Sequence, residues 1–174
     1  MPYRPKTTLL LVSLLLSAGG ACLAAEGEQA SRINSPLGPE ESLAHFKLPP
    51  GVKIELAAAE PEVIDPVAVR FDENGRMWVV EMRDYPNGPP SGEKPLSRIK
   101  VLDDTDGDGR FETARVFADQ LLFATGAQPW HGGVIVTYSG RIDWMKDTDG
   151  DGLADLREHW FTGFAEENPQ LRAN

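Results

Sequence analysis

Two segments of the chain repeat one another in register: RIKVLDDTDGDG at residues 98–109 and RIDWMKDTDGDG at residues 141–152. The arginine, the isoleucine and the whole DTDGDG string recur 43 residues apart. Before the aspartates, apolar and polar residues alternate with the period of a half-buried β-strand. A strand that leads into an acidic loop, present twice, indicates a fold built from repeated β-units.

Both loops carry aspartates at alternate positions, which turns several carboxylates toward one point. Ca²⁺ takes about six to eight oxygen ligands, and a glycine at the sixth position lets the chain turn sharply around the ion. Neighbouring carboxylates also repel one another unless a cation is present. The predicted calcium ligands are Asp104, Asp106, Asp108 and Glu112 in the first loop, and Asp147, Asp149, Asp151, Asp155 and Glu158 in the second.

The flanking residues indicate which kind of calcium site this is. An EF-hand needs a helix on each side of its loop, whereas the segments that enter both loops alternate like strands. Arg115 stands at the twelfth position of the first loop, where an EF-hand has a bidentate glutamate. Residues 153–160 are compatible with a helix, which leaves a dockerin-like alternative. We favour strand–loop–strand clips with a structural role.

The rest of the chain predicts an all-β fold with one short helix at residues 39–46. Further strands are expected at residues 52–57, 67–71, 77–81, 114–117 and 134–138. Asn74 and Gly75 supply a hairpin turn between the second and third of these. Short strands in units of about 40 to 45 residues suggest propeller blades, and a β-sandwich is the alternative.

Residues 39–174 hold about three blades' worth of strands, and closed propellers typically have about four to eight. The chain is therefore expected to be the N-terminal fragment of a longer propeller protein. A complete small β-domain is the alternative, although its sheet edges would be unprotected.

The first 25 residues have the pattern of a secretory signal peptide. Basic residues precede an apolar run at residues 7–16, and small residues lead to a cleavage site after Ala24 or Ala25. A lipid anchor at Cys22, the single cysteine, is the alternative. A transmembrane helix needs about 20 apolar residues, so no membrane span is expected after cleavage. The predicted location is periplasmic or secreted, with residues 26–38 as a flexible leader.

The charge of the chain is strongly acidic, with 27 Asp and Glu against 17 Lys and Arg and a formal net charge of −10. Nucleic-acid binding needs a basic surface, so that class of function is excluded. Nine of the acids are the predicted calcium ligands, and their concentration in two loops calls for a counter-charge.

Other candidate residues carry weaker signals. Arg83–Tyr85 follow a predicted strand where a blade loop would emerge, and such loops often carry function. None of the three histidines pairs with a second one at metal-ligand spacing. His131, near a predicted strand start, is interpreted as a loop histidine, with a general base as the alternative. Three tryptophans at strand-like or repeated positions are predicted core residues: Trp78, Trp144 and Trp160.

Several longer stretches resemble a known family. They are LPPGV at residues 48–52, DPVA at 65–68, FDENGRMWVVEMRDYP at 71–86, PW at 129–130 and FTGF at 161–164. The family is the exported membrane-bound dehydrogenase-like β-propellers, also described as PVC-type haem-binding proteins. They are similar in turn to glucose/sorbosone dehydrogenases that use pyrroloquinoline quinone (PQQ). The resemblance covers about residues 39–174.

The resemblance implies a propeller that, in its full-length form, would use PQQ to oxidise a sugar or polyol. Quinone ligands would come from several blades, so no catalytic or cofactor-binding residue is assigned, and this fragment alone is expected to be inactive. The chain has no CxxCH motif, so haem is not supported. A calcium-stabilised adhesion or carbohydrate-binding module without catalysis is the alternative function.

Overall fold

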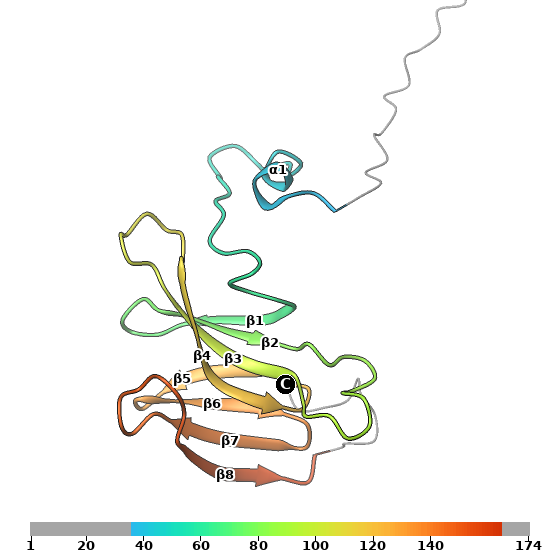
Figure 1. Cartoon of the computed structure of the whole chain (residues 1–174). Coiled ribbons are helices and arrows are strands. Elements are labelled where there is room, and N and C mark those ends of the chain that lie inside the picture. The colour runs from blue at the N-terminus through green and yellow to red at the C-terminus, as the bar shows by residue number, and fades with distance from the viewer. Residues whose placement is uncertain (1–35, 165–174) are drawn as a thin grey trace, which may run out of the picture. The chain divides into compact units, whose positions relative to one another are not determined.

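The computed structural model describes residues 36–164 and is all-β apart from one short helix (Figure 1). The predicted signal peptide, residues 1–25, lies outside the described residues. Helix α1 (Pro39–Leu43) begins with proline and carries Glu40 and Glu41 in its first turn, which favours a helix start. It ends three residues before the predicted end at Phe46.

The described residues form eight strands in two antiparallel sheets of four, which is fewer than the predicted three blades' worth, and within each sheet neighbouring strands follow chain order. Sheet A comprises β1 (Pro66–Phe71), β2 (Met77–Glu81), β3 (Ser97–Asp103) and β4 (Thr113–Leu121). Sheet B comprises β5 (Gly126–Trp130), β6 (Gly133–Tyr138), β7 (Arg141–Lys146) and β8 (Leu156–Thr162).

The structure corrects two sequence expectations about these strands. Residues 52–57 form no strand, although they alternate in polarity. Residues 153–160 do not form a helix, because Leu156–Thr162 pairs with β7 as strand β8. The hairpin turn at Asn74 and Gly75 is confirmed, with Gly75 at a positive φ of 80°.

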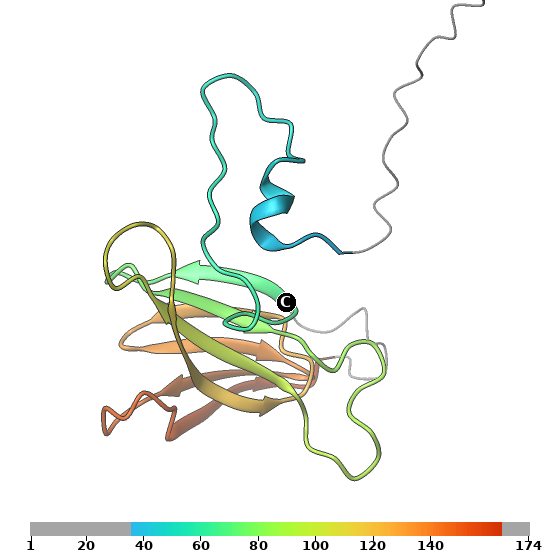
Figure 2. The same ribbon diagram turned by 45° about the horizontal axis from the view of Figure 1, so that its top comes forward.

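The 43-residue repeat corresponds to the third and fourth strands of each sheet. Thr113 begins β4 and Leu156 begins β8, again 43 residues apart. The first two strands of the sheets follow a longer spacing, because residues 82–96 connect β2 to β3 whereas Ser139–Gly140 alone connect β6 to β7. Figure 2 shows this longer connection extending beyond the sheets.

One hydrophobic core lies between the two sheets. It includes Trp78 and Phe117 of sheet A, whose rings meet edge to face at 4.8 Å between centroids, and Val136 and Met145 of sheet B. A smaller core on the opposite face of sheet A is covered by the segment that contains Ala57, Ala58 and Val63. Strand β2 is therefore buried on both faces, which explains its uninterrupted apolar run.

Residues that are equivalent in the repeat face different neighbours. Val101 of sheet A and Met145 of sheet B both point into the core between the sheets. Leu102, the equivalent of Met145, points instead into the smaller core. Trp144, the equivalent of Val101, packs near Trp160 with ring centroids 6.3 Å apart. The two sheets therefore stack in the same orientation. The Met145 face of sheet B packs on the Val101 face of sheet A, whereas the equivalent face of sheet A, which bears Leu102, points away from sheet B.

The tryptophan predictions are confirmed in part. Trp78 and Trp144 are buried, as expected for core residues. Trp160 is 36% exposed, so its assignment to the core is wrong. The reason is a register shift between Ile142 and Asp143 in the β7–β8 ladder, which places Trp160 between two paired residues of an edge strand.

Candidate metal centres

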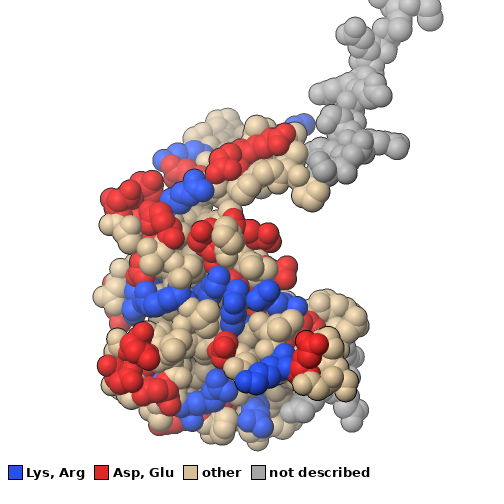
Figure 3. Space-filling view, in the orientation of Figure 1, with Lys and Arg blue, Asp and Glu red and all other residues tan. Residues whose placement is uncertain are grey.

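The two acidic loops occupy equivalent hairpins. Residues 104–112 connect β3 to β4, and residues 147–155 connect β7 to β8. Figure 3 shows acidic side chains gathered at both hairpin tips. Because strands flank both loops, the described residues exclude the EF-hand and the dockerin-like arrangement.

In the first loop, Asp104 organises the turn. Its Oδ1 accepts a hydrogen bond from the Gly107 N–H at 2.7 Å, and its Oδ2 accepts one from the Gly109 N–H at 2.9 Å. Both glycines have positive φ angles, 80° and 92°, which residues with a side chain rarely adopt. The loop is thus shaped by one carboxylate and two glycines.

The second loop repeats this geometry. Asp147 accepts hydrogen bonds from Gly150 at 2.6 Å and Gly152 at 2.9 Å. The Gly150 N–H, and next the Gly152 N–H, hold the pKa of Asp147 below its ordinary value, since both stabilise the carboxylate. The carboxylate at the first loop position therefore stays ionised to a lower pH than an ordinary aspartate does, and the ionised form is the one that binds a cation.

Each loop brings carboxylates to one point. Oxygens of Asp104, Asp106, Asp108 and Glu112 all lie within 4.8 Å of one another, and so do oxygens of Asp147, Asp149 and Asp151. Two oxygens bound to one Ca²⁺ at about 2.3–2.6 Å are at most about 5 Å apart. Both groups therefore fit a calcium ion, whose further ligands would be second carboxylate oxygens, main-chain carbonyls or water.

The ninth loop position differs between the two copies. Glu112 belongs to the first group of carboxylates and also accepts a hydrogen bond from the Thr105 hydroxyl at 3.1 Å. Asp155 accepts bonds from the Thr148 hydroxyl at 2.6 Å and the Thr148 N–H at 2.7 Å, which lower its pKa. The shorter Asp155 side chain lies outside the second group.

Position twelve of neither loop contributes to a group. Glu158 lies in β8 opposite Trp144, and its carboxylate accepts a hydrogen bond from the Trp160 indole at 3.3 Å. Arg115 pairs with Asp103 across the first hairpin. The chain leaves each loop as a strand, and a strand carries these side chains away from the loop centre.

The backbone N–H at the eighth position of each loop forms a hydrogen bond to a neighbouring part of the fold. The Phe111 N–H donates to the Ala57 carbonyl at 2.8 Å, and the Ala154 N–H donates to the Phe117 carbonyl at 2.7 Å. The first bond reaches the segment that covers sheet A, and the second reaches strand β4. Each loop is therefore hydrogen-bonded to the part of the chain that packs against its own sheet.

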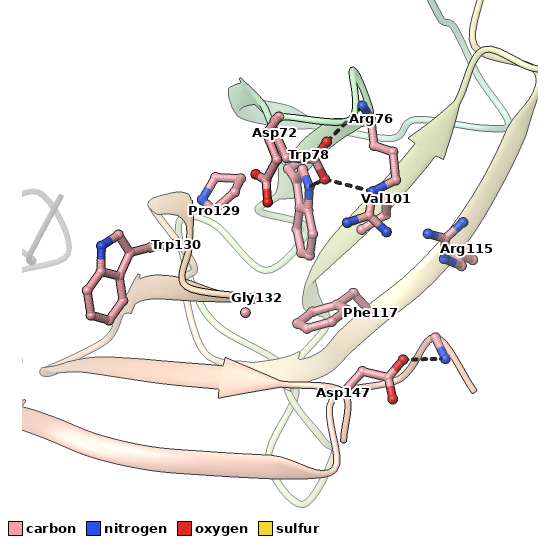
Figure 4. Close-up of a pocket in the computed structure, with 13 residues that line it drawn as sticks. Asp72, Arg76, Trp78, Val101, Arg115, Phe117, Pro129, Trp130, Gly132 and Asp147 are labelled. Atoms are coloured by element: carbon pink, nitrogen blue, oxygen red, sulfur yellow. Dashed lines mark hydrogen bonds and ion pairs between the residues drawn. The ribbon is translucent and has the colours of Figure 1, made fainter. Parts of the chain in front are cut away.

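A cavity of about 140 Å³ lies between the β1–β2 turn and the second loop (Figure 4). Asp72 and Arg76 line it from the turn, Arg115 from β4 and Asp147 from the loop. Three of these charged groups have partners within the protein, because Asp72 bonds Arg76 at 2.7 Å and Arg115 pairs with Asp103.

Sequence reasoning missed a buried polar cluster in sheet B. Asp143 is fully buried, accepts a hydrogen bond from the Tyr138 hydroxyl, and lies 2.9 Å from Nδ1 of His159. Burial, and then Asp143, raise the pKa of Tyr138. The available signal was Asp143 itself, an acid inside the predicted strand at residues 141–146. Lys100, its equivalent in the repeat, is also buried.

The remaining candidates lie apart from both acidic groups. His131 sits in the turn between β5 and β6 at a φ of 53° and is exposed. In Arg83–Tyr85, Asp84 is buried while Tyr85 is 51% exposed. Within residues 36–164, no helix is long and apolar enough to cross a membrane.

The fold and the loops define a class: an all-β protein of two stacked antiparallel sheets with paired acidic hairpin loops. Residues 38–174 match the model of a domain of unknown function, DUF7133, and the chain belongs to this family. Neither the curated proteins nor the solved structures contain a match to the chain.

Proposed function

We propose that the chain forms blades of an exported β-propeller in which the two acidic loops bind calcium. The observation that carries this proposal is the repeated loop geometry, which collects three or four carboxylates within 4.8 Å at equivalent hairpins. The calcium ions offset part of the negative charge of these acids and stiffen the hairpins, in a chain whose only cysteine lies in the predicted signal peptide. Their role is structural.

The stacking of the sheets supports a propeller over a sandwich. The contact is heterologous, since the Val101 face of sheet A meets the face of sheet B that bears Met145, and Leu102 is the equivalent of Met145. A heterologous contact that repeats generates a ring or a helix. A ring of such sheets is a propeller.

The wider assignment rests on the sequence resemblance. We place the chain within an exported, periplasmic or secreted protein related to PQQ-dependent sugar and polyol dehydrogenases. PQQ would supply the redox chemistry in the full-length protein. No described residue is assigned to the quinone, because its ligands would come from several blades around a channel.

Calcium binding is tested by calorimetry and thermal unfolding of the full chain, with calcium or with a chelator. Calcium at about 100 times its Kd should add about 2.7 kcal/mol to the free energy of unfolding. Asp108→Ala and Asp151→Ala should each remove one binding event. Asp119→Ala is the matched control, since Asp119 is an exposed acid of β4 outside both groups. Absence of both calcium heat and thermal shift would overturn the proposal.

A second candidate function is carbohydrate binding or adhesion without catalysis. Two exposed tryptophans favour it: Trp130 is 52% exposed, and its ring centroid lies 5.6 Å from that of Trp160. Exposed aromatic rings stack on the apolar faces of sugars. Both activities are measured on the full-length protein. Reduction of a dye by its quinone-loaded form with a sugar would favour the dehydrogenase, and retention on a glycan without turnover would favour the binding module.

A further inference from the structure

An open hollow of about 340 Å³ lies at the end of sheet A that is remote from the acidic loops. Two parts of the chain form it: the start of β1 and the residues that follow β2. The residues that line it are Asp65, Pro66, Val67, Met82, Arg83 and Tyr85. Its volume is near the lower end of small-molecule pockets, which are typically about 300–1,000 Å³.

The backbone around the hollow departs from regular strand geometry. Asp65 has a φ of 48°, in the left-handed region that few residues other than glycine adopt. The β1–β2 ladder shifts register between Pro66 and Ala68, while the Met82 N–H holds the Asp65 carbonyl at 3.1 Å. Bulges and unusual backbone conformations of this kind concentrate at binding sites.

Three polar side chains line the hollow without a partner. Among the described residues, no hydrogen bond or ion pair is formed by the carboxylate of Asp65, the guanidinium of Arg83 or the hydroxyl of Tyr85. Tyr85 is 51% exposed, Asp65 is exposed and Arg83 is half-buried. These groups are available to a ligand.

Two buried acids fix the segment that presents Arg83 and Tyr85. Asp84 accepts hydrogen bonds from the Leu96 N–H at 3.0 Å and from the Ser97 hydroxyl, and this anchors the connection between β2 and β3. Glu81 accepts one from the Ile64 N–H at 2.8 Å, and so ties the end of β2 to the chain before Asp65. A site supported in this way is preorganised.

We propose that Asp65, Arg83 and Tyr85 form a binding site for a neutral polyhydroxylated ligand of monosaccharide size. The carboxylate and the guanidinium cancel in charge, which suits a neutral ligand. The carboxylate accepts hydrogen bonds from ligand hydroxyls, and the guanidinium donates to ligand oxygens. The Tyr85 ring packs on a C–H face, and Val67 and Met82 supply an apolar wall.

This inference rests on the proposed sugar or polyol chemistry of the chain and assigns to it a set of residues. It needs neither calcium nor quinone. The binding experiment can therefore fail while the calcium proposal stands, and the reverse also holds.

The test is a titration of the full chain, by ligand-observed NMR and calorimetry, with D-glucose, sorbitol and maltose. Maltose distinguishes a free monosaccharide from the end unit of a longer glycan. Arg83→Ala and Asp65→Asn should each raise Kd about tenfold or more, because each removes hydrogen bonds to a charged group. Asparagine tolerates the left-handed backbone of Asp65, so that variant should keep the fold.

Arg70→Ala is the matched control, because Arg70 is an exposed arginine of β1 that does not line the hollow. It should leave Kd within about twofold, as expected for a residue outside the contact. Three results would overturn the proposal: no saturable binding of any of the three compounds, tighter binding of inorganic phosphate or gluconate, or an Arg83→Ala variant that binds like the parent. Thermal unfolding with calcium, measured on the same samples, reports separately on the acidic loops.

Discussion

Asp72 closes the β1–β2 hairpin with a single carboxylate. Its Oδ1 accepts hydrogen bonds from the N–H groups of Asn74 and Arg76, and its Oδ2 accepts them from the Arg76 guanidinium and the Trp78 indole. Burial raises the pKa of Asp72, but these bonds outweigh it and leave the pKa below the ordinary value. The side chain is only 2% exposed, so solvent screens these bonds little.

Asp72→Asn should lower the free energy of unfolding by about 1.5–3 kcal/mol at pH 7, the range for hydrogen bonds to a charged group. Because the folded-state pKa is depressed, the carboxylate stabilises the fold fully above its unfolded-state pKa of about 3.9. This contribution is lost as pH falls through the lower folded-state pKa, so parent and variant should converge there. Urea unfolding at several pH values measures this, with Asp119→Asn as control. A constant difference across the acid range would contradict it.

Gly133 allows two strands to approach closely. A Cβ at this position would collide with the Met145 carbonyl and lie 2.9 Å from Nε1 of Trp144. Gly133→Ala should therefore destabilise the fold by about 1–3 kcal/mol, as expected when a packed site is overfilled. Gly38→Ala is the control, since nothing lies within 4 Å of its Cβ position. A thermal midpoint for Gly133→Ala equal to that of the control would refute the packing argument.

At the scale of elements, one backbone amide of each acidic hairpin forms a hydrogen bond to a neighbouring element. The first hairpin bonds the segment that covers sheet A, and the second bonds strand β4. The Ala154 N–H bonds the Phe117 carbonyl at 2.7 Å, and the Phe111 N–H bonds the Ala57 carbonyl at 2.8 Å. If calcium orders the loops, its removal should loosen both bonds while the central strands stay intact.

Hydrogen exchange by NMR, in calcium and in chelator, measures this loosening. The Ala154 and Phe111 amides should exchange at least about tenfold faster without calcium, and amides of β2 should change far less. Asp151→Ala in calcium should accelerate Ala154 alone, because Phe111 belongs to the other loop. Equal acceleration at β2 would show global destabilisation instead.

Several elements could be predicted from the sequence, and two strands could not. Strands with alternating or continuous apolar residues were located, and β2 was predicted with its observed bounds. Strand β5 was missed because Gly126 and Pro129 are poor strand formers. Strand β8 was missed because its side chains are mostly exposed and show no alternation. Both segments are strands because β5 pairs with β6 and β8 pairs with β7, and this pairing is not visible in the sequence.

The repeat located both candidate sites, but not how side chains are distributed in them. Spacing alone placed Asp155 and Glu158 among the ligands, whereas the structure holds Asp155 on Thr148 and carries Glu158 into β8. The polar groups of the hollow were even less predictable, because Asp65 and Arg83 come to line the same hollow only through the pairing of β1 with β2.

At the scale of the described domain, a single core that spans both sheets makes them depend on one another. Met145 of sheet B is fully buried among residues of both sheets. Met145→Ala should cost about 2–5 kcal/mol, the transfer term plus the cavity left behind. Because the cavity borders sheet A as well, the loss should reach both sheets rather than only the one that carries the substitution.

Native-state hydrogen exchange separates these outcomes, because it reports unfolding free energy amide by amide. In Met145→Ala, the amides of Val79 and Val80 in sheet A should lose the same free energy as those of β6 and β7 in sheet B. Val69→Ala, at a position 40% exposed on β1, should change neither set appreciably. A loss confined to sheet B would mean that the sheets unfold separately. Sheet A, whose second face is covered by the segment around Ala57, would then be the independently stable unit.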